Sequence, residues 1–393
     1  MELKSEQELQ LLGYDELNLR LSRILPGMEQ NGLDAILVSS NSNIFYLTGR
    51  VFCGYILLRA DGSMLCFLRR PNHLRGHGVH EIRKPEDMAA LISPMPQSVG
   101  LEDDTLSYSA ATRLRTIFNA GVSASPILRR ARAVKTPAEI ELMKRSGVSQ
   151  AQVYNTIPHL YQEGMSDIEL QIEIERALRL HGCLGQFRVA GDSMEIFMGN
   201  VLTGDNADTP SPYDFAMGGA GLHPSLPVGA DGTIIKPGLP VMVDMNGNFT
   251  GYMTDMTRCY CLGEPLEKAV SLNRLSADIC RAVAGHAMPG VAAKDLYELA
   301  MEMADKAGQA GNFMGHRYHA GFVGHGIGIE VNELPVLAPR SRDVMQAGMT
   351  FACEPKFVVP GLGAVGVENT YVVRPDGPAE CITLAREEIA NLR

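Results

Sequence analysis

The N-terminal part of the chain combines one helical apolar pattern with several strand-like ones. Apolar residues from Leu17 to Met28 recur at helical spacing and end at an Asn-Gly pair, which predicts an amphipathic helix. Residues 35–38 form a short apolar run. The runs 55–58 and 64–68 flank an Asp-Gly turn, which predicts a β-hairpin. This mixture of elements is typical of an α/β domain.

A change of pattern near residue 133 predicts a domain boundary. The tetrapeptide Thr136-Pro-Ala-Glu139 places a capping threonine, a first-turn proline and a glutamate where a helix should begin. Residues 128–134, just before it, are interpreted as a linker strand. A length of 393 residues exceeds what one hydrophobic core usually supports. We therefore predict two domains, residues 1–132 and 133–393.

The second domain contains a weak internal repeat. Gly164 and Gly290 each precede a helical pattern, and these patterns end at Gly182 and Gly308, which gives both glycine pairs an offset of 126 residues. Each of these helices follows an earlier one and precedes a strand-rich stretch. Two αα-then-β halves related by a pseudo-twofold axis would explain the repeat, although glycines commonly flank unrelated helices as well.

Composition narrows the range of partners and of cellular locations. The chain is 45% hydrophobic with a net charge of −10, which argues against nucleic acid or an anionic membrane as the main partner. No stretch approaches the roughly 18 apolar residues of a membrane span, and no apolar signal segment follows the N-terminus. The eight cysteines lack the spacing of a disulfide framework. We therefore expect a cytoplasmic protein.

Two aspartates lie inside apolar strand patterns in the second domain. Asp244 ends the run Val-Met-Val-Asp, and Asp255 follows a Gly/Asn-rich turn in the next predicted strand. A buried carboxylate is unfavourable unless it is paired or bound to a metal, and two facing carboxylates repel each other unless a cation lies between them. A single strand aspartate is more often a hydrogen-bonded core residue. A pair in one hairpin favours a cation.

Three further candidates follow along the chain. His325 has a glycine on each side, which allows a close approach of the backbone. Glu354 ends an apolar run, and Glu368 lies inside another. An oxygen-rich site with a single histidine favours Mn²⁺, Co²⁺ or Fe²⁺, and Zn²⁺ also fits. Four carboxylates balance two divalent ions and leave room for a bridging hydroxide.

These motifs resemble metallopeptidase family M24, which has the pita-bread fold, in its aminopeptidase P, prolidase and creatinase branch. The segments 34–38 and 43–49 resemble the N-terminal domain of that branch, and 134–140 resembles its linker. The resemblance implies an α/β (α+β) fold in which a creatinase-like α/β domain precedes a pita-bread domain. It also implies a homodimer.

The same resemblance implies a role for each candidate ligand. Asp244 and Asp255 would bind one metal ion, and His325 and Glu354 the other. Asp255 and Glu368 would bridge the two ions, and Glu354 would also act as general base. The implied function is a dinuclear metal-dependent hydrolase, an aminopeptidase or dipeptidase of the Xaa-Pro type, which cleaves short peptides through a metal-bridging hydroxide.

The chain departs from that family around the expected substrate. Val228 and Asn332 stand where the family usually has histidines, and Gly366 stands in place of an arginine. These departures weaken the prediction of Xaa-Pro specificity more than that of metal binding. The remaining candidates for substrate contact are polar residues in the second domain. They are Arg188, His223, His319 and Asn332. For Arg188 a structural salt bridge is an alternative role, and for His319 a position in a surface loop is the alternative.

Two other classes of function remain open. The same fold supports non-peptidase hydrolases and lyases that act on small amidic or onium metabolites, so fold alone does not decide the reaction. A non-catalytic binding scaffold is the second alternative. The presence of all five ligand-type residues argues against a scaffold, because a scaffold has no need for converging buried acids.

Overall fold

A computed structural model describes residues 7–189, 198–213 and 218–393. The chain divides into two compact units, Met1–Arg132 and Ala133–Arg393. Among the described residues, no helix has both the length and the apolar character that a membrane span requires.

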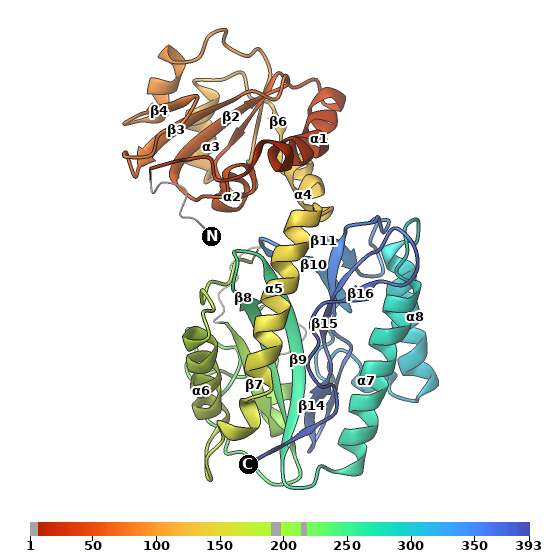
Figure 1. Cartoon of the computed structure of the whole chain (residues 1–393). Coiled ribbons are helices and arrows are strands. Elements are labelled where there is room, and N and C mark those ends of the chain that lie inside the picture. Colours follow the sequence, from red (N-terminus) through yellow and green to blue (C-terminus); the bar gives the residue numbers. More distant parts are fainter. Residues whose placement is uncertain (1–6, 190–197, 214–217) are drawn as a thin grey trace. The chain divides into compact units, whose positions relative to one another are not determined.

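The first unit contains a six-stranded sheet with strand order β4-β3-β2-β1-β5-β6 (Figure 1). The predicted first helix, the apolar strand and the hairpin are confirmed, since β1 pairs antiparallel with β2 and β2 with β3. The elements are α1 (Tyr14–Gln30), β1 (Ala35–Val38), α2 (Asn41–Thr48), β2 (Cys53–Arg59), β3 (Met64–Arg70), β4 (Val79–Glu81), η1 (Pro85–Ala90), β5 (Val99–Leu101), α3 (Tyr108–Arg115), β6 (Val122–Ser123) and α4 (Ser125–Ala133).

The predicted linker strand at 128–134 is wrong. Residues up to Ala133 belong to helix α4. Leu128 and Ala131 are buried while Arg129 and Arg130 are exposed, which is a helical period rather than a strand alternation. Leucine, arginine and alanine also have high helix propensity.

The second unit begins with two helices followed by a sheet. The capping box predicted at the start of α5 is present: Glu139 N–H donates to Thr136 Oγ1 at 3.1 Å, and Thr136 N–H donates to Glu139 Oε2 at 2.7 Å. The elements of this half are α5 (Pro137–Tyr154), η2 (Ile157–His159), α6 (Asp167–Leu180), β7 (Gly199–Thr203), η3 (Gly204–Asp208), β8 (Pro240–Asn248) and β9 (Met253–Leu262).

The second half of this unit repeats the helix–helix–sheet order. The helices α6 and α8 each have 14 residues, and their first residues, Asp167 and Ala293, are separated by the offset of the glycine repeat. The elements are α7 (Glu267–His286), α8 (Ala293–Lys306), η4 (Ala310–Asn312), β10 (Gly324–Ile327), β11 (Val331–Leu337), β12 (Thr350–Cys353), β13 (Lys356–Val359), β14 (Gly363–Gly366), β15 (Asn369–Val372), β16 (Glu380–Cys381) and β17 (Ala390–Leu392).

The strands of the second unit form sheets with orders β17-β9-β8-β7 and β11-β10-β12-β15-β16, together with the β13-β14 hairpin. Helices α5 and α6 pack on β7, β8 and β9, while α7 packs on β13 and β14 and α8 on β11 (Figure 1). Strand β9 also contacts β10, β12 and β15. The helices therefore lie on the outside, and the strands that carry the candidate ligands come together inside.

Candidate metal centre

The five predicted ligands lie on strands, or directly beside the ends of strands, that meet between the two sheets. Asp244 and Asp255 lie on β8 and β9, where Asp244 is paired with Thr257 and Asp255 with Asn246. His325 lies on β10, Glu354 directly follows β12, and Glu368 lies between β14 and β15. Each of the last four residues is at least nine-tenths buried; these are Asp255, His325, Glu354 and Glu368. Four acidic groups thus share a small interior space with one imidazole.

The glycines beside His325 allow its strand to fit between two others. A Cβ atom at Gly324 would lie 2.3 Å from the Ala352 carbonyl oxygen of β12, and one at Gly326 would lie 2.3 Å from Leu334 of β11. Any larger residue would push β10 out of this position. The glycines on both sides of His325 therefore reflect close packing of the backbone. This packing fixes the position of the buried imidazole.

One group of three ligands is formed by Asp255, His325 and Glu368, whose ligand atoms lie within 4.8 Å of one another. His325 Nδ1 contacts the Gly326 carbonyl oxygen at 3.1 Å, while Nε2 lies on the side of the acids, 3.4 Å from Glu354 Oε1. Within the described structure, the buried Glu368 Oε1 has no hydrogen-bond partner. A buried carboxylate oxygen without a donor is unfavourable unless a cation satisfies it, so the donor set fits one divalent ion.

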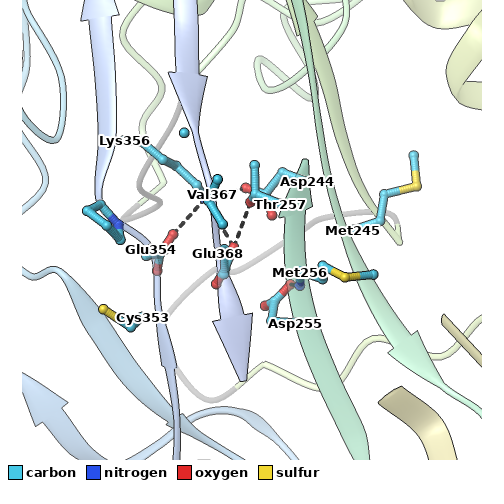
Figure 2. A network of polar contacts seen from close by, with 12 residues as sticks. Asp244, Met245, Asp255, Met256, Thr257, Cys353, Glu354, Lys356, Val367 and Glu368 are labelled. Carbon is cyan, nitrogen blue, oxygen red and sulfur yellow. Dashed lines mark hydrogen bonds and ion pairs between the residues drawn. The ribbon is translucent and has the colours of Figure 1, made fainter. Parts of the chain in front are cut away.

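A second group is formed by Asp244, Glu354 and Glu368, and a lysine lies within it (Figure 2). The Lys356 Nζ atom is 2.6 Å from Asp244 Oδ2, 2.7 Å from Glu354 Oε2 and 3.3 Å from Glu368 Oε2. The Lys356 side chain is fully buried. Sequence reasoning missed this residue, although a lysine directly before the apolar run Phe-Val-Val and two residues after a candidate ligand is a signal that could have found it.

The charged groups of this cluster change one another's pKa values. Burial, and next the Asp244 carboxylate, raise the pKa of Asp255 to about 7. Burial alone would raise the pKa of Glu354, but Lys356 and His325 outweigh it and lower this pKa to about 2. Burial and the Glu354 carboxylate raise the pKa of Glu368 well above its usual value. Glu354 is therefore ionised at neutral pH, whereas Asp255 and Glu368 gain most from an added cation.

Neighbouring polar groups hold the ligands in position. Thr257 Oγ1 donates to Glu368 Oε2 at 2.7 Å (Figure 2). The Asp255 N–H donates to Thr370 Oγ1 at 2.9 Å. The buried Arg258 guanidinium donates to the Glu368 carbonyl oxygen at 2.7 Å and to Asn369 Oδ1 at 2.7 Å. These contacts orient the backbone on both sides of Glu368, so its carboxylate direction is determined by the fold.

The candidate residues for substrate contact lie in several different parts of the second unit. His223 is exposed, and its Nδ1 lies 2.9 Å from Ser225 Oγ within a local turn. His319 is also exposed, and its Nδ1 lies 2.8 Å from the Phe313 carbonyl oxygen. The Arg188 carbonyl oxygen accepts from Val331 N–H at 2.7 Å, which places Arg188 beside the start of β11. Asn332 follows in β11 with a φ of 67°. Val228 is buried.

Family models match both parts of the chain. A model described as "Creatinase/Prolidase N-terminal domain" matches residues 20–134, and one described as "Metallopeptidase family M24" matches residues 141–375. The chain belongs to metallopeptidase family M24. The fold class predicted from sequence is therefore confirmed, with a creatinase-type N-terminal domain before the M24 catalytic domain.

Relatives of this M24 chain cover nearly its whole length. An Xaa-Pro dipeptidase of Pyrococcus horikoshii is 23% identical over 95% of this chain and 100% of its own. The structure of an Xaa-Pro dipeptidase from Bacillus anthracis covers 96% of this chain and 100% of its own, with a TM-score of 0.79 and 22% identity. Aminopeptidase P from E. coli matches with a TM-score of 0.71 at 14% identity, covering 96% and 97% of the two chains. At these identities the structural matches establish the fold.

Proposed function

We propose that this M24 chain is a metal-dependent peptidase that hydrolyses short peptides. The observation that carries the proposal is the buried donor set of Asp255, His325 and Glu368, in which Glu368 Oε1 has no hydrogen-bond partner within the described structure. Xaa-Pro dipeptidases among its relatives support the choice of a peptide substrate.

The donor set suggests which ion binds. Two carboxylates and one imidazole favour Mn²⁺, Co²⁺ or Fe²⁺, and Zn²⁺ also fits this set. Asp255, His325 and Glu368 would hold the ion. The chemistry it supplies when bound is activation of a water molecule and polarisation of the scissile carbonyl group.

Glu354 is proposed as the catalytic proton acceptor. It remains ionised at neutral pH because the Lys356 ammonium and His325 lower its pKa to about 2, against the effect of burial. Its Oε1 lies 3.4 Å from His325 Nε2, so it lies beside the proposed ion position. A carboxylate held there can take a proton from an attacking water and then deliver it to the leaving amine.

The proposed substrate is a small peptide, and Xaa-Pro cleavage is only one member of that class. Val228, Asn332 and Gly366 replace the two imidazoles and the guanidinium that the family resemblance leads us to expect near the scissile bond. We therefore include small amidic metabolites as a second substrate class. The candidates for substrate contact are Arg188, His223, His319 and Asn332. Arg188 and Asn332 lie close together, because the residue before Asn332, Val331, donates its N–H to the Arg188 carbonyl oxygen.

One experiment separates these functions. The metal-stripped chain is reconstituted separately with Mn²⁺, Co²⁺, Fe²⁺ and Zn²⁺ and assayed on dipeptides, tripeptides, and amidic and onium metabolites, beside a Glu368→Gln control. We expect metal-dependent hydrolysis of short peptides that the control lacks. Turnover of metabolites alone would favour the non-peptidase alternative, and metal binding without turnover of any substrate would favour a scaffold.

We also propose a cytoplasmic location and a homodimer. All eight cysteines are free thiols, and most are buried, which agrees with a reducing compartment. The dimer rests on the family resemblance alone. Cell fractionation tests the location, and light scattering coupled to gel filtration tests the assembly.

A further inference from the structure

The ammonium group of Lys356 lies inside the second of the two ligand groups. It is 2.6–3.3 Å from one oxygen of each of three carboxylates, Asp244, Glu354 and Glu368. These three form the second of the two ligand groups in the described residues, and Figure 2 shows the lysine extending between them. The place where a second divalent ion would bind is therefore filled by a charged side chain of the protein itself.

We propose that Lys356 is a built-in cation that permanently replaces one of two metal ions, so that the centre binds a single ion at Asp255, His325 and Glu368. This inference rests on the proposed function, since it assumes a metal ion in the first group. It replaces the two-ion interpretation of the sequence with a one-ion centre.

Exclusion of a second ion follows from space and charge. Mn²⁺ or Zn²⁺ would bind these carboxylate oxygens at about 2.0–2.2 Å, inside the same cage that the ammonium occupies. An ion at that point would overlap the Lys356 Nζ atom and face a like charge in a buried site. The lysine already balances the carboxylates through charge-assisted hydrogen bonds, so an ion would have to displace it.

The sequence creates room for this lysine. Lys356 opens β13 and is directly paired with Gly366 of β14. A Cβ atom at Gly366 would lie 2.9 Å from Lys356 Cγ and 3.0 Å from its Cα. Any larger residue at position 366 would crowd the lysine stem where it begins. Gly366, where the family resemblance leads us to expect an arginine, thus leaves the space that the stem of Lys356 occupies.

The first ligand group still needs a cation. Lys356 contacts Glu368 through Oε2, whereas the buried Oε1 of Glu368 has no partner in the part of the chain that the structure describes. His325 Nδ1 is held by the Gly326 carbonyl oxygen, so Nε2, which lies 3.4 Å from Glu354 Oε1, is the ring nitrogen that would bind a metal. One oxygen of Glu368 is thus paired with a positive charge of the protein, and an ion would supply the positive charge for the other.

Lys356 is a positioning residue in this arrangement. An ammonium group has three N–H donors, and the three surrounding carboxylates use all of them. None remains for a substrate carbonyl group. Its effect on the reaction is to fix the carboxylates of Asp244, Glu354 and Glu368 around the single ion.

Metal stoichiometry tests the proposal without an activity assay. Wild type, Lys356→Ala and Lys135→Ala are stripped with chelator, saturated with Mn²⁺, and measured by elemental analysis and calorimetry. Lys135 is the matched control, because it is a buried lysine 2.8 Å from Glu333 Oε2, outside the two ligand groups. We expect about one Mn²⁺ per chain in wild type and the control, and about two in Lys356→Ala.

Each other outcome has a defined meaning. Two Mn²⁺ in wild type, or one in Lys356→Ala, would overturn the lysine inference and leave the proposed function standing. No Mn²⁺ in wild type would overturn the proposed function itself. If Lys356→Ala does not fold, wild-type crystals grown with Mn²⁺ decide through anomalous scattering: one peak supports the inference, and two peaks overturn it.

Discussion

Two buried glutamates, one in each unit of the chain, differ in how their carboxylate oxygens are satisfied. In the N-terminal unit, Glu102 is 1% exposed and accepts hydrogen bonds from the N–H groups of Ser39 and Ser40. The Ser40 hydroxyl, at 2.7 Å, and the Asn43 amide complete its shell at the start of helix α2. Glu368 in the catalytic unit is equally buried, yet one of its oxygens has no partner in the described structure.

The difference shows how a structural acid is distinguished from a ligand. Both residues are 1% exposed, so burial alone does not separate them. The number of protein donors does, because a carboxylate whose lone pairs are filled by N–H and O–H groups needs no cation. Around Glu368 the neighbours are mainly other acids, and Lys356 satisfies only part of their charge. The remainder is available to an ion.

The largest predicted effect is on turnover when an acid of the catalytic cluster loses its charge. Glu354→Gln keeps the shape of the side chain but removes the proton acceptor and one negative charge beside His325. We expect kcat to fall at least about 1000-fold while circular dichroism stays unchanged. Steady-state kinetics on the best peptide substrate measure this. Activity within about tenfold of wild type would remove Glu354 from the mechanism.

The next effect concerns the choice of substrate. Val228 and Gly366 have no side-chain donor where the resemblance leads us to expect an imidazole and a guanidinium, and Asn332 has an amide in place of an imidazole. Each missing donor to a developing oxyanion typically costs about 100- to 1000-fold in rate. We therefore expect Xaa-Pro dipeptides to be weaker substrates than other short peptides or amidic metabolites. A kcat/KM of about 10⁴ M⁻¹s⁻¹ or more on Xaa-Pro dipeptides would contradict this.

Metal should stabilise the catalytic unit because it supplies a positive charge next to Glu368 Oε1, which has no partner in the described structure. With Mn²⁺ at about 100 times its Kd, the free energy of unfolding should rise by about 2.7 kcal/mol. Thermal and urea unfolding of the stripped and reconstituted chain measure this difference. Glu368→Gln, which removes one ligand charge, should lose the gain. Equal stabilisation of that variant would place the ion elsewhere.

The smallest effect is expected at Glu102, whose role is structural. Glu102→Gln turns one acceptor oxygen into an NH₂ group that faces the N–H and O–H donors of Ser39, Ser40 and Asn43. We expect a loss of about 1–3 kcal/mol in the free energy of unfolding, with Mn²⁺ content and kcat unchanged. Urea unfolding and elemental analysis together test this. A loss of bound Mn²⁺ would contradict the contrast between the two glutamates.

Sequence alone determined the elements whose signals are local. The helical spacing that gave α1, the Asp-Gly hairpin of β2 and β3, and the capping box of α5 each depend on neighbouring residues, and each is present in the structure. The five candidate ligands could also be recognised from the sequence, because an acid or a histidine within or next to an apolar strand pattern is unusual. The linker strand at 128–134 was wrong because so short a stretch does not separate a helical period from a strand alternation.

Only the tertiary structure decided how the acids are neutralised. Whether an acid has enough donors depends on residues far away in sequence, such as the Thr257 hydroxyl and the Arg258 guanidinium that hold Glu368. The position of Lys356 depends on a long, flexible side chain, and its direction follows from the pairing with Gly366 across a hairpin. The sequence shows that Lys356 carries a charge but does not show where its side chain points. The packing around the side-chain stem determines that orientation.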